Sequence, residues 1–396
     1  MRKIGRREFL KQSSLAGVMV ATPLPASPDW PLGLEPAGSA PTDPADSPGA
    51  ALVPGRQLDS REFCLSLYER TAPSLTFSAT DARSARRWQS RVRRTLVELL
   101  GGLPAERVDL RPEILETKDL GTYTREKLVF QSRDNLSVIG YLLLPKDRPR
   151  PLPAIVCLPG HGRSVDDIVG IAEDGTQRTA RTTGYARDFA VQVVENGYAA
   201  LAIEQLAFGY RRDEAARRSG PEADSCRPAA CAALLFGQTM LGWRVWDVMR
   251  AIDYLETRPE IDPARIATMG ISGGGTVSLF SAALDERIRV AVVSCYFNTF
   301  RDSIVSLSHC PDNYVPGILS YIEMYDLAGL VAPRGLFIEA GTRDRIFPIE
   351  GSRIAIEKAR HIYSVFGVPE KFGHEIFDGG HEFHGTGAFA FLARWL

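Results

Sequence analysis

The chain has 396 residues, of which 44% are hydrophobic and 24% are charged, and its formal net charge is −1 at pH 7. A chain of this length and composition can bury a full hydrophobic core. The balanced charge excludes a bulk electrostatic attraction to nucleic acid or to anionic membranes. We therefore expect a soluble globular protein that has no nucleic acid as a partner.

The N-terminal segment indicates export. Arg6 and Arg7 precede a moderately apolar stretch that runs from about residue 15 to residue 26. Paired arginines before a short apolar run are typical of a twin-arginine signal, which the export machinery recognises. Pro23 interrupts this run, which is shorter than the ~20 apolar residues that a permanent membrane span needs. An ordinary basic amphipathic N-terminus is the alternative interpretation.

The remainder of the chain is expected to fold as one domain. Pro, Ala, Ser, Gly and Asp dominate the first fifty positions, and no internal repeat follows them. We predict an export signal over residues 1–30, a disordered linker over residues 31–55 and a single domain over residues 56–396. The expected location is the periplasm or the outside of the cell.

Export would place six cysteines in an oxidising compartment. Two pairings are candidates for a disulfide, Cys226 with Cys231 and Cys295 with Cys310. Cys157 lies in an apolar run and is expected to be an inert core residue.

The first element of the domain is a helix over residues 82–100. Its apolar residues, from Ala85 to Leu99, recur at spacings of three and four and form one face. Arginines fall largely on the opposite face, which we interpret as solvated and not as a nucleic-acid surface. Gly101 and Gly102 end the helix.

A hairpin and a series of short strands follow. The segments "TREKLVFQS" and "LSVIGYLLLP" show the alternation of strands, and "SRDN" is typical of the turn between them. Short apolar runs separated by helical stretches then predict an α/β fold with a mostly parallel sheet and helices on both faces. These runs span residues 154–158, 198–203, 265–270, 289–294, 335–340 and 371–377.

A serine inside a glycine run, "MGISGGGTV", lies between one of these strands and a helix start. Gly270, Ser272 and Gly274 fit the pattern G-x-S-x-G. In a nucleophile elbow the serine occupies a strained turn, and small neighbours let strand and helix approach closely. A P-loop would need Gly-Lys-Ser/Thr here, and a dinucleotide-binding loop would need glycine at position 272. The placement therefore predicts Ser272 as a nucleophile.

A serine hydroxyl needs a base to take its proton and a further group to orient that base. Asp344 comes just after one strand, and His381 comes just after the last strand. Because the carboxyl ends of parallel strands lie at one edge of a sheet, we expect both side chains to converge on Ser272 in the chain order Ser, Asp, His. Alternatively, Asp344 pairs only with Arg343 or Arg345, or stabilises its own turn.

The segment "HEFH" also admits a metal pair of His381 and His384, but no further Cys or His ligands lie nearby in the sequence. We therefore expect no metal and no cofactor. His161, in "LPGHGRS", is a candidate second base, although it follows an early strand, where main-chain donors are usual. The backbone N–H of Gly273 is the first candidate donor to an oxyanion, and that of Arg163 is the second, with Gly162 as its alternative.

With these motifs the chain resembles the α/β-hydrolase superfamily, and more narrowly the secreted bacterial hydrolases near dienelactone hydrolases and acetyl xylan esterases. The resemblance covers roughly residues 85–396 and rests on "PGHGRS", "GISGGG", "AGTRDRIFP" and "GGHEF". It implies an α/β-hydrolase fold preceded by N-terminal helices, with Ser272, Asp344 and His381 as the triad. Related enzymes act on acetyl or methyl esters of plant polysaccharides. Dienelactone hydrolases use a cysteine nucleophile, so the serine argues against that activity.

Substrate contacts are expected from two loops above the same sheet edge, residues 163–184 and 204–237. We therefore predict an exported serine esterase whose substrate is a small ester or a saccharide ester. The alternatives are a peptidase or amidase with the same triad, and a carbohydrate- or partner-binding protein without chemistry. The candidate substrate-binding residues are His161, Glu204, Arg211 and His309.

Overall fold

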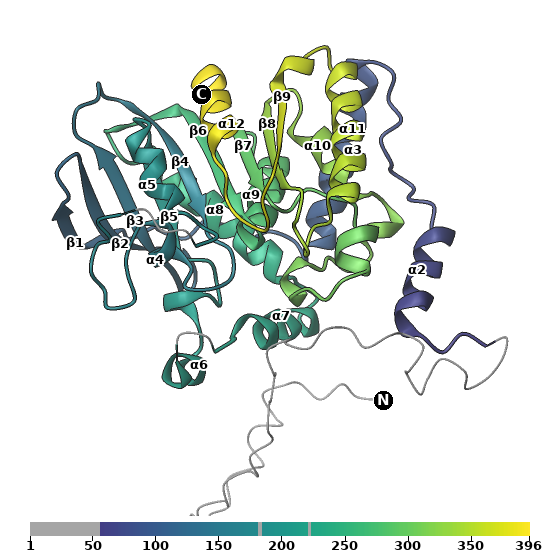
Figure 1. Ribbon diagram of the computed structural model, residues 1–396, viewed down its shortest axis with the longest axis horizontal. Coiled ribbons are helices and arrows are strands. Elements are labelled where there is room, and N and C mark those ends of the chain that lie inside the picture. The colour runs from purple at the N-terminus through teal and green to yellow at the C-terminus, as the bar shows by residue number, and fades with distance from the viewer. Residues whose placement is uncertain (1–55, 181–183, 221–222) are drawn as a thin grey trace, which may run out of the picture. The chain divides into compact units, whose positions relative to one another are not determined.

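A sheet of nine strands forms the centre of the part of the chain that the structure describes, in the order β1-β2-β3-β5-β4-β6-β7-β8-β9 (Figure 1). The neighbours from β1 to β5 pair antiparallel, and those from β5 to β9 pair parallel. The strands are β1 (Glu113–Asp119), β2 (Tyr123–Arg133), β3 (Leu136–Pro145), β4 (Leu152–Leu158), β5 (Ala199–Ile203), β6 (Ile261–Ile271), β7 (Ile288–Ser294), β8 (Gly335–Gly341) and β9 (Phe372–Phe377).

The computed structural model describes residues 56–396, except residues 181–183 and 221–222. Within these bounds, Gln57–Leu396 form one compact unit. No helix in the described ranges is both long and apolar enough to cross a membrane. The expected export signal and linker lie outside the described residues.

Helices cover both faces of the sheet (Figure 1). One buried cluster joins α3, α8, α9, α10 and α11 to one face, and a second joins α4, α5 and α12 to the other. The helices are α2 (Ser60–Arg70), α3 (Ala82–Leu99), α4 (Val165–Ile168), α5 (Phe189–Glu195), α6 (Glu214–Ser219), α7 (Cys226–Leu235), α8 (Met240–Glu256), α9 (Gly273–Leu284), α10 (Leu327–Val331), α11 (Ile349–Val365) and α12 (Thr386–Trp395).

Strand β4 shows why the sheet needs helices on both sides. Ala154, Val156 and Leu158 belong to the first buried cluster, whereas Ile155 and Cys157 belong to the second. Successive side chains of a strand point to opposite faces, so a continuous apolar run must be buried on both. The prediction of a mostly parallel α/β sheet is confirmed, as is that of Cys157 as a core residue.

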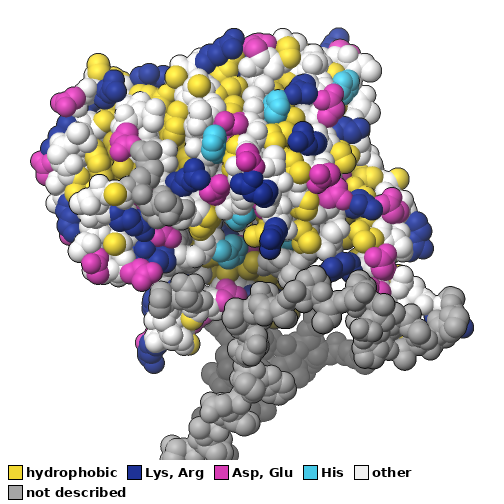
Figure 2. Space-filling model, in the orientation of Figure 1, with side chains coloured by type: hydrophobic (Ala, Val, Ile, Leu, Met, Phe, Trp, Pro, Cys, Tyr) yellow, Lys and Arg dark blue, Asp and Glu magenta, His cyan; other side chains and the backbone are white. Residues whose placement is uncertain are grey.

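The other predicted elements are also present. Helix α3 buries Ala85, Trp88, Val92 and Leu96 and leaves its arginine face exposed. Strands β2 and β3 form the predicted hairpin. On the face in Figure 2, Lys and Arg side chains are interspersed with Asp and Glu, so this face carries no extended patch of one charge.

Two expectations need correction. Residues 204–237 do not form a plain loop, because they include a 3-10 turn at Gly209–Arg211 and the helices α6 and α7. Neither candidate disulfide is present in this structure, in which the thiols of Cys226, Cys231, Cys295 and Cys310 are all free. Cys226 and Cys231 both lie on α7, with Cys226 buried and Cys231 exposed.

Candidate active site

The glycine run folds into a sharp turn between β6 and α9. Ser272 joins the two elements with φ 57° and ψ −124°. A non-glycine residue with positive φ is strained and persists only where its surroundings enforce it. A Cβ on Gly274 would lie 1.9 Å from the carbonyl oxygen of Leu158, and a Cβ on Gly270 would lie 2.2 Å from that of Gly274. Only glycine fits either position, which explains the spacing of the motif.

The buried Asp344 pairs with the partly buried His381. The Nδ1–H of His381 donates to Oδ2 of Asp344 at 2.8 Å. The other carboxylate oxygen, Oδ1, accepts the backbone N–H groups of Ile346 and Phe347 at 2.8 and 3.0 Å. Both oxygens of Asp344 are therefore occupied, and Nε2 of His381 remains available as a base. The alternative partner Arg343 pairs with Asp378 instead.

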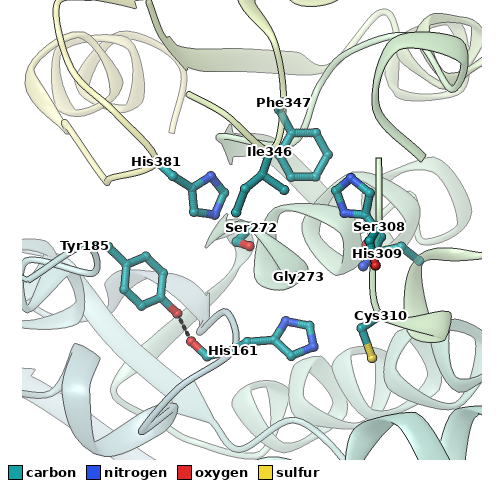
Figure 3. Close-up of a pocket in the computed structure, with 11 residues that line it drawn as sticks. His161, Tyr185, Ser272, Gly273, Ser308, His309, Cys310, Ile346, Phe347 and His381 are labelled. Carbon is teal, nitrogen blue, oxygen red and sulfur yellow. Dashed lines mark hydrogen bonds between the residues drawn. The ribbon is translucent and has the colours of Figure 1, made fainter. Parts of the chain in front are cut away.

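Ser272 and His381 line one cavity of about 390 Å³ (Figure 3). The imidazole of His381 lies between two aromatic rings, with centroid distances of 6.1 Å to Tyr185 and 5.9 Å to Phe347. None of the residues that line the cavity is Lys, Arg, Asp or Glu. The full lining is His161, Tyr185, Ser272, Gly273, Ser308, His309, Cys310, Asn313, Ile346, Phe347 and His381.

The position of the cavity follows from the sheet. Strand β6 ends one residue before Ser272, β8 ends shortly before Asp344, and β9 ends shortly before His381. Since these neighbouring strands are parallel, their carboxyl ends meet at one edge. The expected convergence of these side chains therefore occurs, and their catalytic roles stay predictions.

His161 lies on the cavity wall opposite His381 (Figure 3). Its Nε2 lies 3.4 Å from Oδ2 of Asp312. Burial opposes protonation of His161, but contact with Cys226 and the charge of Asp312 outweigh it and raise its pKa. The hydroxyl of Tyr185 donates to the backbone oxygen of His161 and so ties this loop to the wall that holds His381.

His309 comes from the segment between β7 and β8 and also lines the cavity. Its ring centroid lies 5.0 Å from that of Phe347. Burial lowers its pKa, which favours the neutral imidazole. A neutral His309 can donate a hydrogen bond to a bound carbonyl or hydroxyl oxygen through one ring nitrogen, or accept one from a hydroxyl group through the other.

Two other candidate substrate-binding residues do not line this cavity. Glu204 is fully buried, where its carboxylate accepts from the Ser164 hydroxyl and the backbone N–H of Tyr210. The guanidinium of Arg211 lies 2.7 Å from the carboxylate of Asp247, and both side chains are almost fully buried. These partners hold both side chains away from this cavity, and their contact with substrate stays a prediction.

The remaining motif residues also have defined places. Arg163 does not line this cavity. Its guanidinium has Nη1 at 3.0 Å from Asp167 and Nη2 at 3.1 Å from the carbonyl oxygen of Ile171. His384 pairs with Glu375 at 3.1 Å.

Two groups of potential metal ligands occur among the described residues, each with its ligand atoms within 4.8 Å of one another. One group is Cys295 with Asp344 and His381, in which the hydrogen bond between His381 and Asp344 already uses one atom of each. The second group is His161, Cys226, Cys310 and Asp312.

Several residues of the cavity wall were not predicted. Phe347 comes three residues after the predicted acid Asp344 in the segment "DRIFP", and this closeness was the one signal that could have indicated it. Tyr185 lies in no motif, and neither Ser308 nor Asn313 has a pattern that singles it out. These residues reach the cavity only through the path of long connections between strands.

Comparison with known proteins identifies relatives of this architecture. The model of a family described as the Abhydrolase family matches residues 51–374. A Bacillus subtilis protein named as a hydrolase, YtaP, is 29% identical over 264 residues, which are 65% of this chain and 82% of that protein. The 4-O-methyl-glucuronoyl methylesterase of Phanerochaete carnosa is 28% identical over 208 residues, which are 46% of this chain and about half (49%) of the relative.

Solved structures show the same fold. A Bacteroides fragilis protein described as an acetyl xylan esterase superposes with a TM-score of 0.69 at 20% identity, over 82% of this chain and 83% of the other. A glucuronoyl esterase from Solibacter usitatus superposes with a TM-score of 0.62 at 18% identity, over 81% of this chain and 96% of the other. The predicted α/β-hydrolase fold is confirmed.

Proposed function

The chain belongs to the Abhydrolase family, and from this premise we propose that it is an exported serine hydrolase that cleaves carboxylic esters. The observation that carries the proposal is one arrangement of side chains. Ser272, at the turn between β6 and α9, lines the same cavity as His381. A 2.8 Å hydrogen bond to Asp344 orients the imidazole of His381.

The reaction starts with attack of Ser272 Oγ on the ester carbonyl. Nε2 of His381 takes the serine proton and returns it to the departing alkoxide, while Asp344 stabilises the imidazolium. Backbone N–H groups of Gly273 and Arg163, with Gly162 as the alternative to Arg163, hold the oxyanion. Removal of one such donor typically costs about 10²- to 10³-fold in kcat. Water, activated by His381, then hydrolyses the acyl-enzyme.

We assign the substrate to the acetyl or methyl esters of plant polysaccharides or their oligosaccharides. Several relatives carry names of this chemistry, including acetyl xylan esterase and 4-O-methyl-glucuronoyl methylesterase. A cavity of about 390 Å³ whose lining contains no Lys, Arg, Asp or Glu suits a small neutral ester group. Its His309 and Asn313 can meet sugar hydroxyl groups by hydrogen bonding.

The test of the proposal is hydrolysis by the purified protein beside its Ser272→Ala variant. Useful substrates are p-nitrophenyl acetate and butyrate, acetylated xylan, methyl-esterified pectin and a methyl ester of glucuronic acid. We expect turnover of at least one polysaccharide ester, lost in the variant. Turnover that persists in Ser272→Ala would refute the assigned nucleophile, and folded protein that cleaves none of these esters would favour a binding role.

Export by the twin-arginine machinery is part of the proposal, with Arg6 and Arg7 as its support. The expected destination is the periplasm or the medium. Fractionation of cells that express the full chain, compared with a variant in which both arginines are lysine, tests it. Retention of the variant in the cytoplasm supports export by this route, whereas equal secretion of both contradicts it.

A further inference from the structure

Two cysteines that the proposed reaction does not use lie against each other beside the cavity. The Sγ atoms of Cys226 and Cys310 are 3.2 Å apart, although 84 positions separate the residues. Cys226 begins α7, and Cys310 precedes the short 3-10 turn at Pro311–Asn313 between β7 and β8. Tertiary packing alone brings these thiols together.

We propose that Cys226 and Cys310 form a disulfide that fastens α7 to the wall of the active-site cavity. A disulfide has an S–S bond of about 2.0 Å, so the two sulfurs need to approach by about 1 Å. Both cysteines precede or begin a short helical segment, where a small side-chain rotation changes the sulfur position. The inference goes beyond the proposed ester hydrolysis and does not depend on it.

The two thiols differ in how easily an oxidant in solution can reach them, and this difference decides which thiol reacts first. Cys310 lines the open cavity, whereas Cys226 is 1% exposed. The oxidant is a disulfide compound, which the thiolate of Cys310 attacks to form a mixed disulfide and release one thiol. The sulfur of Cys226, as thiolate, then attacks Cys310 Sγ and displaces the second thiol. The protein loses two protons and two electrons, and the oxidant disulfide becomes two thiols.

The surroundings of Cys226 act on this step in opposite directions. Nη2 of Arg244 lies 3.2 Å from Cys226 Sγ, and the guanidinium is buried. This fixed positive charge favours the thiolate that must attack Cys310, but contact with the Cys310 thiol and burial outweigh it and raise the pKa of Cys226. The thiol also donates a hydrogen bond to Oδ2 of Asp312 at 3.2 Å.

The same charges argue against a metal ion at these residues. His161, Cys226, Cys310 and Asp312 do place their ligand atoms within 4.8 Å of one another. A divalent cation bound there would lie beside the guanidinium of Arg244, which already contacts Cys226 and Asp312. A disulfide adds no charge and leaves the ion pair of Arg244 with Asp312 intact.

The other cysteines serve as controls for this pair. Cys231 lies on the same helix as Cys226 but is exposed, and Cys64 is also exposed. Cys157 and Cys295 are buried, and Cys295 contacts the carbonyl oxygen of Glu382. A reaction that depended on exposure alone would select Cys64 and Cys231.

The disulfide would close a ring of the chain that contains β6, the elbow, α9 and β7. Closing a long loop stabilises a protein mainly by restricting its unfolded state. We therefore expect oxidation to raise the Tm by a few degrees Celsius. It would also hold Cys310, and with it the wall formed by Ser308 and His309, at a constant distance from α7.

The experiment treats the purified full chain with oxidised glutathione and maps its peptides without reduction, after blocking free thiols. We expect a peptide joined through Cys226 and Cys310, with Cys64 and Cys231 free of this link. The Tm should rise on oxidation and fall again with dithiothreitol in the unchanged protein and in Cys231→Ser, but not in Cys310→Ser.

Three results would overturn the proposal: Cys226 and Cys310 remaining free after oxidation, either one pairing with another cysteine, or bound metal protecting both thiols. The peptide map of the unchanged protein decides the question even if a variant fails to fold. Esterase activity is not a readout here, so failure of the disulfide and failure of the proposed function are distinguishable.

Discussion

Asp344 holds His381 through one carboxylate oxygen while its second oxygen accepts the backbone N–H groups of Ile346 and Phe347. The carboxylate of Asp344 thereby positions the imidazole that faces Ser272. It also positions the backbone of Ile346 and Phe347, whose side chains form an apolar part of the cavity wall. We therefore expect a substitution at Asp344 to lower activity through His381 much more than it lowers the stability of the fold.

Replacement of Asp344 by Asn tests this relationship. The amide keeps the shape of the side chain but cannot stabilise an imidazolium, and it favours the wrong tautomer of His381. We expect kcat for p-nitrophenyl acetate to fall about 10⁴-fold. Unchanged circular dichroism and a Tm close to that of the unchanged protein would show that the loss is chemical. A loss below tenfold would remove Asp344 from the triad.

The elbow should tolerate no side chain at Gly274. A Cβ there would meet the carbonyl oxygen of Leu158 at 1.9 Å, while a Cβ at Gly380 would meet nothing within 4 Å. We expect Gly274→Ala to lower the free energy of unfolding by about 3 kcal/mol or more, and Gly380→Ala to change it by about 0.5 kcal/mol or less. Urea denaturation measures both, and equal effects would contradict the close approach of α9 to β4.

A buried carboxyl group should make stability depend on pH. Burial raises the pKa of Glu339 to about 7, and its Oε2 has no hydrogen-bond partner. In the unfolded chain the group titrates near its ordinary pKa of about 4.5. Between these values the folded protein holds the proton more tightly than the unfolded chain does. The free energy of unfolding should therefore fall as pH rises from about 4.5 to about 7, by up to about 3 kcal/mol for this group.

The variant Glu339→Gln isolates this contribution. Its amide oxygen can still accept the backbone N–H of Gly385, as Oε1 of Glu339 does at 2.6 Å, but it does not ionise. The stability gained by the variant should be larger at pH 7.5 than at pH 5, as measured by urea denaturation at each pH. A constant difference between the two proteins would show that Glu339 is ionised throughout this range.

Arg211 and His309 should respond differently to substitution, although both were candidates for substrate binding. Arg211→Met leaves the carboxylate of Asp247 buried without its partner, which typically costs about 3 to 5 kcal/mol of stability. His309→Ala removes a side chain of the cavity wall, and we expect KM to rise about tenfold with a smaller loss of stability. Steady-state kinetics and thermal unfolding of both variants separate the two roles. A raised KM in a stable Arg211→Met variant would support its predicted contact with substrate.

Much of the fold could be predicted because it depends on local pattern. The apolar runs that became β4 and β5 are uninterrupted, and those of β6, β7 and β8 contain few polar residues; buried parallel strands need such runs on both faces. Strand β1 was missed, because all of its residues are exposed and it carries no apolar alternation. Helices α6 and α7 were missed for a related reason, since their segment is rich in charged and small residues and lacks a long apolar face.

By itself, the sequence determined the central strands and the edge of the sheet at which Ser272, Asp344 and His381 meet, because chain order and strand direction place loop residues there. Only the tertiary structure decided which neighbours share the cavity. It placed Tyr185 and Phe347 against His381, withdrew Glu204 and Arg211 into the interior, and brought Cys226 to Cys310 instead of Cys231. The physical reason is that these contacts join distant segments, whose separation is set by packing across the whole sheet and not by any local pattern.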